Sequence, residues 1–276
     1  MTVCHIESIK SKSILARSKV PTMDYCINPY VGCQFGCKYC YASFMSKYCG
    51  MENYEWGSYV LVKENLYNVL FKELSRTKDP GRPLIIGSVT DPYQPLEAKY
   101  RQTRKVLEAL IERKYAGRVT LMTKSGLILR DTDLIKRLNC EVGISVSAPD
   151  DEIVRYFEKG VPSISNRLKT LSELIKSGVN AYSFVGPIFP HAIGDPKSLD
   201  DIFKRLCRTG VRRLLLSYIN LRHDQKRKIR DYFRDSSLDK FYGYNSVPYK
   251  GELKKLLKSA VAKYNFELLY TNIIDH

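Results

Sequence analysis

The sequence predicts an α/β protein in which parallel strands alternate with helices, followed by a basic helical extension. Three observations predict this fold class. The chain has 276 residues, 44% hydrophobic and 27% charged, which is typical of a folded protein that can bury a sizeable core. Short apolar runs alternate along it with amphipathic stretches of helical spacing. No apolar run approaches the roughly 20 residues that a membrane helix needs.

The expected elements follow one another in a regular order. Apolar runs predict strands over 25–28, 83–89, 119–123, 142–147, 181–185 and 212–217. Apolar residues three and four positions apart predict helices over 64–76, 102–114, 131–138, 166–177 and 199–208. About six strand–helix units fit before residue 220, which is too few for a closed eightfold barrel. We therefore expect one domain over 1–219 and a basic C-terminal extension over 220–276 that packs on it.

Positive charge is concentrated near the C-terminus. The formal net charge is +16, and residues 204–263 hold 17 Lys/Arg against 5 Asp/Glu, a net of +12. The densest block, residues 222–234, mixes basic residues with Tyr232 and Phe233. Such a region favours a nucleic acid, because basic side chains hold phosphates while aromatic rings stack on bases. An acidic peptide or nucleotide-like substrate, or a merely solvated surface, are the alternatives.

Three of the eight cysteines crowd into the segment Cys33-Gln-Phe-Gly-Cys37-Lys-Tyr-Cys40. Gly32 and Gly36 allow a tight loop there, and such clustering favours a metal over a disulfide. Structural zinc needs four closed ligands, and no second cysteine or histidine pair is present. A 4Fe–4S cube held by three thiolates leaves one iron open to a small molecule. Cys26, Cys140 and Cys207 are expected to be structural, the last two as buried apolar thiols.

The CxxxCxxC spacing, with an aromatic residue before the last cysteine, resembles the cluster motif of the radical S-adenosylmethionine (SAM) enzymes. Residues 28–33, 90–95 and 123–125 and the pair Arg130-Asp131 resemble the spore photoproduct lyase-like branch. Further matches around 27–45 and 55–57 resemble the radical SAM mobile pair group, which is named for its pairing with a second radical SAM protein. The resemblance implies a partial (β/α)6 barrel, a 4Fe–4S cluster on these cysteines, and reductive cleavage of SAM to a 5′-deoxyadenosyl radical.

Candidate SAM-binding residues follow from the rule that parallel barrels carry their active sites at the C-terminal ends of strands. Lys124 suits the SAM carboxylate as a point charge, whereas Asp91 or Thr90 suits the amine or ribose. Ser145 suits the carboxylate or ribose, and Tyr39 could pack against the cofactor. The alternatives are a solvated Lys124, turn chemistry for Asp91 before Pro92, and an ordinary strand hydroxyl for Ser145.

One position departs from the family pattern. In spore photoproduct lyase a hydrogen-donating cysteine lies three positions before the residue that aligns with Asp91, and here that position is Ser88. Because a serine O–H is a much poorer hydrogen-atom donor than a thiol, repair by that route is not expected. Tyr39 and Tyr41, which flank the last cluster cysteine, are kept as candidate cofactor-binding residues. Tyr39, Tyr41 and Ser88 are the catalytic candidates.

The favoured function is a radical SAM enzyme that modifies or repairs a nucleic acid. One alternative is the same chemistry on a peptide or small molecule, and another is a non-enzymatic, metal-stabilised nucleic-acid-binding protein. The resemblance implies a reductant such as flavodoxin or ferredoxin and a second radical SAM protein as partners. No membrane partner is expected, and the polar N-terminus predicts a cytoplasmic location.

Overall fold

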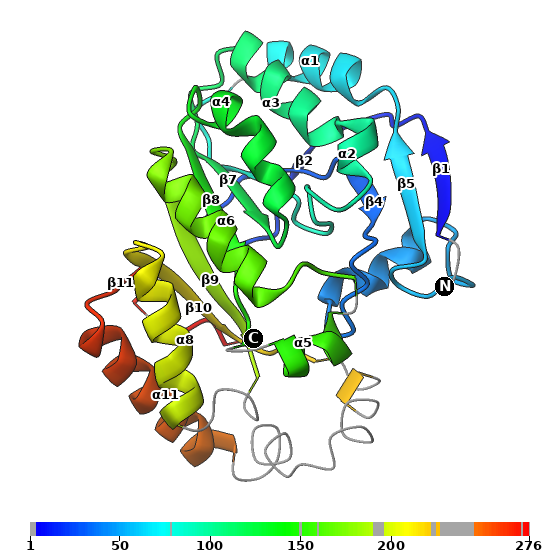
Figure 1. The fold of residues 1–276 in the computed structure, drawn as a ribbon. Coiled ribbons are helices and arrows are strands. Elements are labelled where there is room, and N and C mark those ends of the chain that lie inside the picture. The colour runs from blue at the N-terminus through cyan, green and yellow to red at the C-terminus, as the bar shows by residue number, and fades with distance from the viewer. Residues whose placement is uncertain are drawn as a thin grey trace.

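The computed structural model describes residues 4–77, 79–148, 151–158, 160–189, 196–221, 225–226, 246–271 and 273–275. The larger of its two sheets has the strand order β11-β10-β9-β8-β7-β6-β3-β2 and is not closed (Figure 1). Its strands are β2 (Leu15–Arg17), β3 (Tyr25–Ile27), β6 (Leu84–Ile86), β7 (Val119–Thr123), β8 (Cys140–Ser145), β9 (Ala181–Ile188), β10 (Arg213–Tyr218) and β11 (Glu267–Leu268). The six strands from β3 to β10 are parallel, which confirms the partial barrel.

Helices cover the outer face of this sheet (Figure 1). The α-helices of the described residues are α1 (Leu66–Arg76), α2 (Glu97–Tyr100), α3 (Gln102–Glu112), α4 (Thr132–Ile135), α5 (Asp151–Phe157), α6 (Ile164–Lys176), α8 (Pro196–Arg208) and α11 (Ser246–Lys263). α5 lies apart from the outer layer (Figure 1) and contacts the cysteine segment, where the Lys38 N–H donates to the Phe157 carbonyl. Leu66, Leu70 and Leu74 show why α1 forms, because the spacing of four residues places all three on the buried face. Among the described residues, no helix is both long enough and apolar enough to cross a membrane.

The helix expected over 131–138 is shorter than predicted. A 3₁₀ helix, η2 (Gly126–Asp131), comes first, and α4 adds a single turn. Cys140 is buried as expected, but Cys207 is exposed, contrary to the prediction. The reason is helical geometry, because α8 buries Leu199, Ile202, Phe203 and Leu206 and leaves position 207 on the opposite face.

The C-terminal segment joins the barrel sheet. β11 pairs in parallel with β10, and Ile274 forms a bridge to Ser217. α11 packs beside α8, where Lys263 forms an ion pair with Asp200 at 2.6 Å. The division at residue 219 stays a prediction, and the 222–234 block lies outside the described residues apart from Gln225 and Lys226.

A small second sheet was not predicted from the sequence. It has the order β1-β5-β4, formed by β1 (His5–Ile9), β5 (Tyr59–Lys63) and β4 (Tyr30–Gly32). β4 runs directly into the cysteine segment and pairs antiparallel with β5. This sheet therefore fixes the start of the cysteine segment beside the edge of the barrel.

Candidate functional site

The cysteine segment forms a tight loop between β4 and the 3₁₀ helix η1 (Tyr41–Tyr48). Gly32 has φ +88, and a Cβ there would lie 2.4 Å from the Tyr59 carbonyl oxygen. Gly36 has φ +55 and lies against Gly57. Both glycines are required because other residues rarely adopt this backbone conformation. Below, residues 33–40 are called the cluster loop.

The three thiols of the cluster loop lie in a protected environment. Cys33 and Cys37 are 6% and 7% exposed, Cys40 is partly buried, and all three are free. Burial raises the pKa of Cys33 to about 12 and that of Cys37 well above its usual value. Neighbouring negative charge, from Asp91 for Cys33 and from Glu158 for Cys37, acts in the same direction. Because a metal binds thiolates, a cluster bound here must displace these protons.

Three polar side chains clamp the cluster loop at its first cysteine. Thr90 Oγ1 donates to the Gly32 carbonyl at 2.6 Å, and Gln94 Nε2 donates to the same oxygen at 3.3 Å. Gln94 Oε1 accepts from the Gln34 N–H at 2.8 Å, and Gln34 Oε1 accepts from the Leu96 N–H at 2.9 Å. The residues on both sides of Cys33 are therefore held by the segment that follows β6. The Thr90 hydroxyl serves this clamp, and its contact with SAM stays a prediction.

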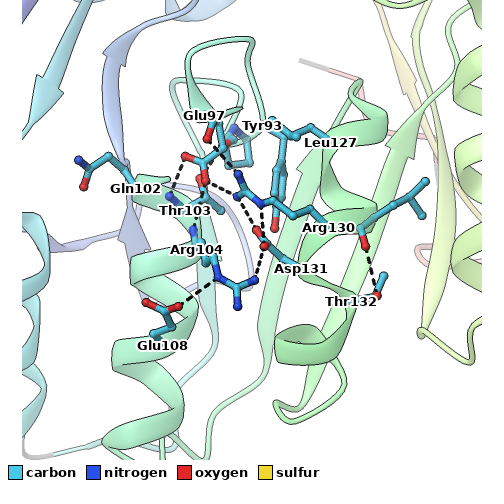
Figure 2. A network of polar contacts seen from close by, with 12 residues as sticks. Tyr93, Glu97, Gln102, Thr103, Arg104, Glu108, Leu127, Arg130, Asp131 and Thr132 are labelled. Atoms are coloured by element: carbon cyan, nitrogen blue, oxygen red, sulfur yellow. Dashed lines mark hydrogen bonds and ion pairs between the residues drawn. The ribbon is translucent and has the colours of Figure 1, made fainter. Parts of the chain in front are cut away.

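A buried ionic network anchors the segment that follows β6 (Figure 2). Glu97 and Asp131, both fully buried, accept from Arg130 Nη2 at 2.7 Å each. Arg104 Nη1 lies 2.7 Å from the other Asp131 oxygen, and Tyr30 of β4 donates to Glu97. Because every carboxylate here meets an arginine, the network suits a rigid support rather than a reactive centre.

Asp91 and Lys124 meet where β6 and β7 end. Asp91 accepts from the Thr123 hydroxyl at 2.6 Å, the Tyr93 N–H at 2.9 Å and the Lys124 N–H at 3.0 Å. The bond to Tyr93 is the turn chemistry weighed above as an alternative. The Asp91 carboxylate therefore joins two strand ends and orients the backbone of Lys124.

The Lys124 ammonium faces the cluster loop. Its Nζ lies 5.9 Å from the centre of the Tyr39 ring, and no side chain or carbonyl among the described residues accepts a hydrogen bond from it. Burial lowers the pKa of Lys124, but the negative charge of Cys37, then of Glu158 and Asp91, outweighs burial and raises it. Lys124 is thus a cation with free donors beside the thiols.

Tyr39, on the other side of the loop, joins a buried polar group at the end of β8. Its hydroxyl donates to Glu158, which also pairs with Arg167. Ser147 Oγ donates to Glu158 at 3.4 Å, and Ser145 Oγ donates to a backbone carbonyl of β9 at 3.0 Å. Ser145 thus makes the bond of an ordinary strand hydroxyl, and its contact with SAM stays a prediction.

Tyr41 and Ser88 come together at the open side of the site. Tyr41, 51% exposed, donates from its hydroxyl to the Ser88 carbonyl. The Asn28 amide holds the Ser88 hydroxyl at 3.1 Å. Burial raises the pKa of the Cys26 thiol, and a hydrogen bond with the Ser88 side chain offsets part of that increase. Two of the three catalytic candidates are therefore neighbours, whereas Tyr39 is buried with Glu158.

The side chains present fit a 4Fe–4S cluster with a bound amino acid moiety. Three thiols lie on one loop, and a lysine with free donors beside them suits a carboxylate. The described residues hold no group of three or more His, Cys, Asp or Glu side chains placed around a single metal ion. A cube does not need that arrangement, because each thiolate binds a different iron.

Sequence reasoning did not find several residues that build the site. They are Gln34, Gln94, Glu158, Arg167 and Gln225. Gln94 lies in the same short segment as Thr90 and Asp91, and this position was the only feature of the sequence that indicated a role for it in the site. Glu158 and Arg167 lie on one side of the barrel and carry no spacing that marks a site. Gln225 lies in the C-terminal basic region and contacts the loop only through the fold.

Comparisons with known proteins agree with this architecture. A sequence model of the radical SAM superfamily matches residues 27–192. An uncharacterized protein of Methanocaldococcus jannaschii is 37% identical over 190 residues, which cover 68% of this chain and 69% of that protein. An uncharacterized protein of Mycobacterium tuberculosis is 27% identical over 217 residues, covering 75% of this chain and 63% of that protein.

Two solved structures share the fold at low sequence identity. Spore photoproduct lyase complexed with dinucleoside spore photoproduct superposes with a TM-score of 0.72 at 19% identity, covering 96% of this chain and 82% of that one. Streptococcus suis SuiB bound to precursor peptide SuiA superposes with a TM-score of 0.56 at 12% identity, covering 97% of this chain and 48% of that one.

Proposed function

Because the chain belongs to the radical SAM superfamily, whose enzymes use a 4Fe–4S cluster and SAM, we propose that it modifies or repairs a nucleic acid by radical chemistry. When bound, the cluster and SAM supply a 5′-deoxyadenosyl radical that abstracts a hydrogen atom. The substrate class is the part of this proposal that goes beyond the family, and it depends on the surroundings of the cluster loop.

Each site residue has a role in this proposal. The three cysteines of the cluster loop hold the cluster, and Lys124 holds the SAM carboxylate through its free donors. Asp91 orients Lys124 by binding its backbone N–H at 3.0 Å. Tyr39 packs beside Lys124 and, through Glu158, keeps the loop against the barrel. Tyr41 and Ser88 border the open side, where a substrate would approach.

One contact carries the choice of a nucleic acid. Gln225 Nε2 donates to the carbonyl oxygens of Lys38 at 3.0 Å and Cys40 at 3.3 Å. Gln225 belongs to the block 222–234, the densest basic stretch of a chain with net charge +16. Gln225 therefore lies against the cluster loop, and basic residues beside it in the sequence could hold phosphates near the reacting atoms.

One of the two structural matches supports this choice, and neither identifies the substrate of this chain. Spore photoproduct lyase, which has the same fold, is known in complex with dinucleoside spore photoproduct, whereas SuiB is known in complex with a precursor peptide. Ser88 replaces the hydrogen-donating cysteine, so we do not propose the repair reaction of spore photoproduct lyase. The proposal is a different modification or repair of a nucleic acid.

The direct test measures SAM cleavage that depends on substrate. The protein is incubated anaerobically with SAM and dithionite in the presence of separate RNA, DNA and peptide pools, and 5′-deoxyadenosine is quantified. We expect stimulation by RNA or DNA, and none in a variant that has alanine at all three cluster cysteines. Stimulation by the peptide pool alone would reject the nucleic-acid proposal and leave the radical chemistry standing.

A second test addresses the basic block. Replacing Lys226, Arg227 and Lys228 by Gln should reduce the slope of log affinity against log salt by about 0.9 per lost duplex contact, or about 0.7 for a single strand. A matched control removes the same charge from α11 through Lys254, Lys255 and Lys258. An equal effect of the two variants would show that only total charge matters.

We also propose partners for the electron supply. Superfamily chemistry needs a one-electron reductant, for which a flavodoxin or ferredoxin is suitable. The resemblance to the mobile pair group adds a second radical SAM protein, which would be detected by co-purification from cells that express both. Cytoplasmic location is part of the proposal, because the described cysteines are free thiols.

A further inference from the structure

An exposed row of aromatic rings begins immediately after the last cluster cysteine. Tyr41, Phe44 and Tyr48 lie along η1, and their rings contact one another in sequence. The ring centroids are 6.4 Å apart between Tyr41 and Phe44 and 5.9 Å apart between Phe44 and Tyr48. Tyr41 is 51% exposed and Tyr48 is 78% exposed, so the row is largely open to solvent. We call these three residues the aromatic row.

Tyr48, at the end of the aromatic row farthest from Cys40, is not part of the hydrophobic core. Ala42 is the buried residue of η1, and the Tyr48 hydroxyl makes no hydrogen bond to another described residue. Exposed large aromatic side chains in contact with one another mark interaction surfaces more often than isolated ones do. The row therefore has free ring surface at the side of the cluster loop where a substrate would approach.

The surrounding charge identifies the partner. The row starts at Tyr41, directly after Cys40, whose carbonyl oxygen binds Gln225 of the basic block. Lys47 is exposed on η1 itself, between Phe44 and Tyr48. A row of rings that carries an exposed lysine matches a strand whose bases are unpaired, because bases stack on rings while a lysine holds a phosphate.

We propose that the aromatic row binds unpaired bases of a nucleic-acid substrate next to the base that reacts at the cluster. This inference rests on the proposed function and specifies it, since it selects single-stranded or locally opened nucleic acid over a closed duplex. Tyr41 lies nearest to the cluster and Tyr48 farthest from it along η1. The row thus guides the strand toward the open side of the site.

The test compares a 20-nucleotide fluorescein-labelled single strand with the same strand carrying abasic sites, which keeps the phosphates and removes the bases. Tyr48→Ala should weaken binding of the intact strand about tenfold, within the range measured for stacking of a base on an aromatic side chain. Tyr48→Phe keeps the ring and should bind as wild type. The salt slope should stay unchanged in Tyr48→Ala, since no phosphate contact is lost.

Controls separate this inference from the proposed function. Tyr270→Ala removes another exposed tyrosine, 38% exposed, which bonds Thr22 through its hydroxyl and is outside the aromatic row, and it should bind as wild type. The abasic strand should bind the wild type and Tyr48→Ala equally. Wild-type affinity of Tyr48→Ala and Phe44→Ala for the intact strand would overturn the aromatic row while leaving nucleic-acid binding intact. No binding of any strand by the wild type would instead reject the proposed function.

Discussion

The clamp on the cluster loop predicts that Gln94→Ala impairs the cluster without touching any of its ligands. Gln94 is fully buried, and its amide makes three hydrogen bonds, to Gly32, Gln34 and Thr90. The alanine variant leaves the Gln34 N–H without its acceptor. Gly32 is then held by Thr90, and Gln34 keeps the bond that its side chain accepts from the Leu96 N–H.

The size of the effect follows from these bonds. An unsatisfied buried donor costs about 1–3 kcal/mol, and each further lost hydrogen bond about 0.5–1.5 kcal/mol. The Gly32 carbonyl keeps its bond from Thr90 at 2.6 Å, so the total is about 3 kcal/mol. For a chain of this size, about 2–4 °C per kcal/mol predicts a Tm lower by roughly 6–12 °C.

The assay has two readouts. Thermal unfolding of the apo protein gives the loss of stability, and the charge-transfer absorption after anaerobic reconstitution gives the cluster content per chain. We expect Gln94→Ala to lower both and to lose its cluster faster during incubation with a chelator. Gln102→Ala is the matched control, because Gln102 is equally buried but its side-chain carbonyl has no partner among the described residues.

Comparison of Gln94→Ala with Gln102→Ala tests whether the clamp controls the cluster. Gln102→Ala should retain wild-type cluster content whatever its stability, since its side chain does not contact the cluster loop. Equal cluster content and equal retention in Gln94→Ala and the wild type would refute the clamp. Equal losses in both glutamine variants would show that general destabilisation, rather than the position of the loop, controls the cluster.

Three further predictions concern the site. Alanine at all three cluster cysteines should abolish the iron–sulfur absorption and SAM cleavage together, and retained absorption would contradict the ligand assignment. Lys124→Ala should keep the cluster and weaken SAM binding measured by equilibrium dialysis. Asp91→Ala should do the same, because Asp91 no longer orients Lys124. Wild-type SAM affinity in both variants would show that Asp91 serves only the turn and that Lys124 is an ordinary surface residue. Glu158→Ala should lower the free energy of unfolding by about 3–5 kcal/mol in urea titrations, because it leaves Arg167 buried and unpaired; a loss below about 1 kcal/mol would argue against a buried pair.

The sequence by itself determined the parts of this protein that depend on local pattern. The alternation of apolar runs and amphipathic stretches predicted the six parallel strands, because strand and helix periodicity are properties of neighbouring residues. The spacing of Cys33, Cys37 and Cys40 predicted the loop, and Gly32 and Gly36, which were expected to allow its tight turn, have positive φ. The strand-end rule selected Asp91 and Lys124, which the structure brings together.

Only the tertiary structure decided what surrounds that loop. The sheet β1-β5-β4 was missed because its three strands are short and β1 pairs with β5 across more than fifty residues of sequence. The clamp by Gln94, the bond of Tyr39 to Glu158, and the contact of Gln225 with Cys40 all join residues far apart in the chain. Periodicity and spacing record only near neighbours, so contacts of this kind leave no local signal. They depend on how the strands and helices pack, and they determine where the thiols lie and which charges reach them.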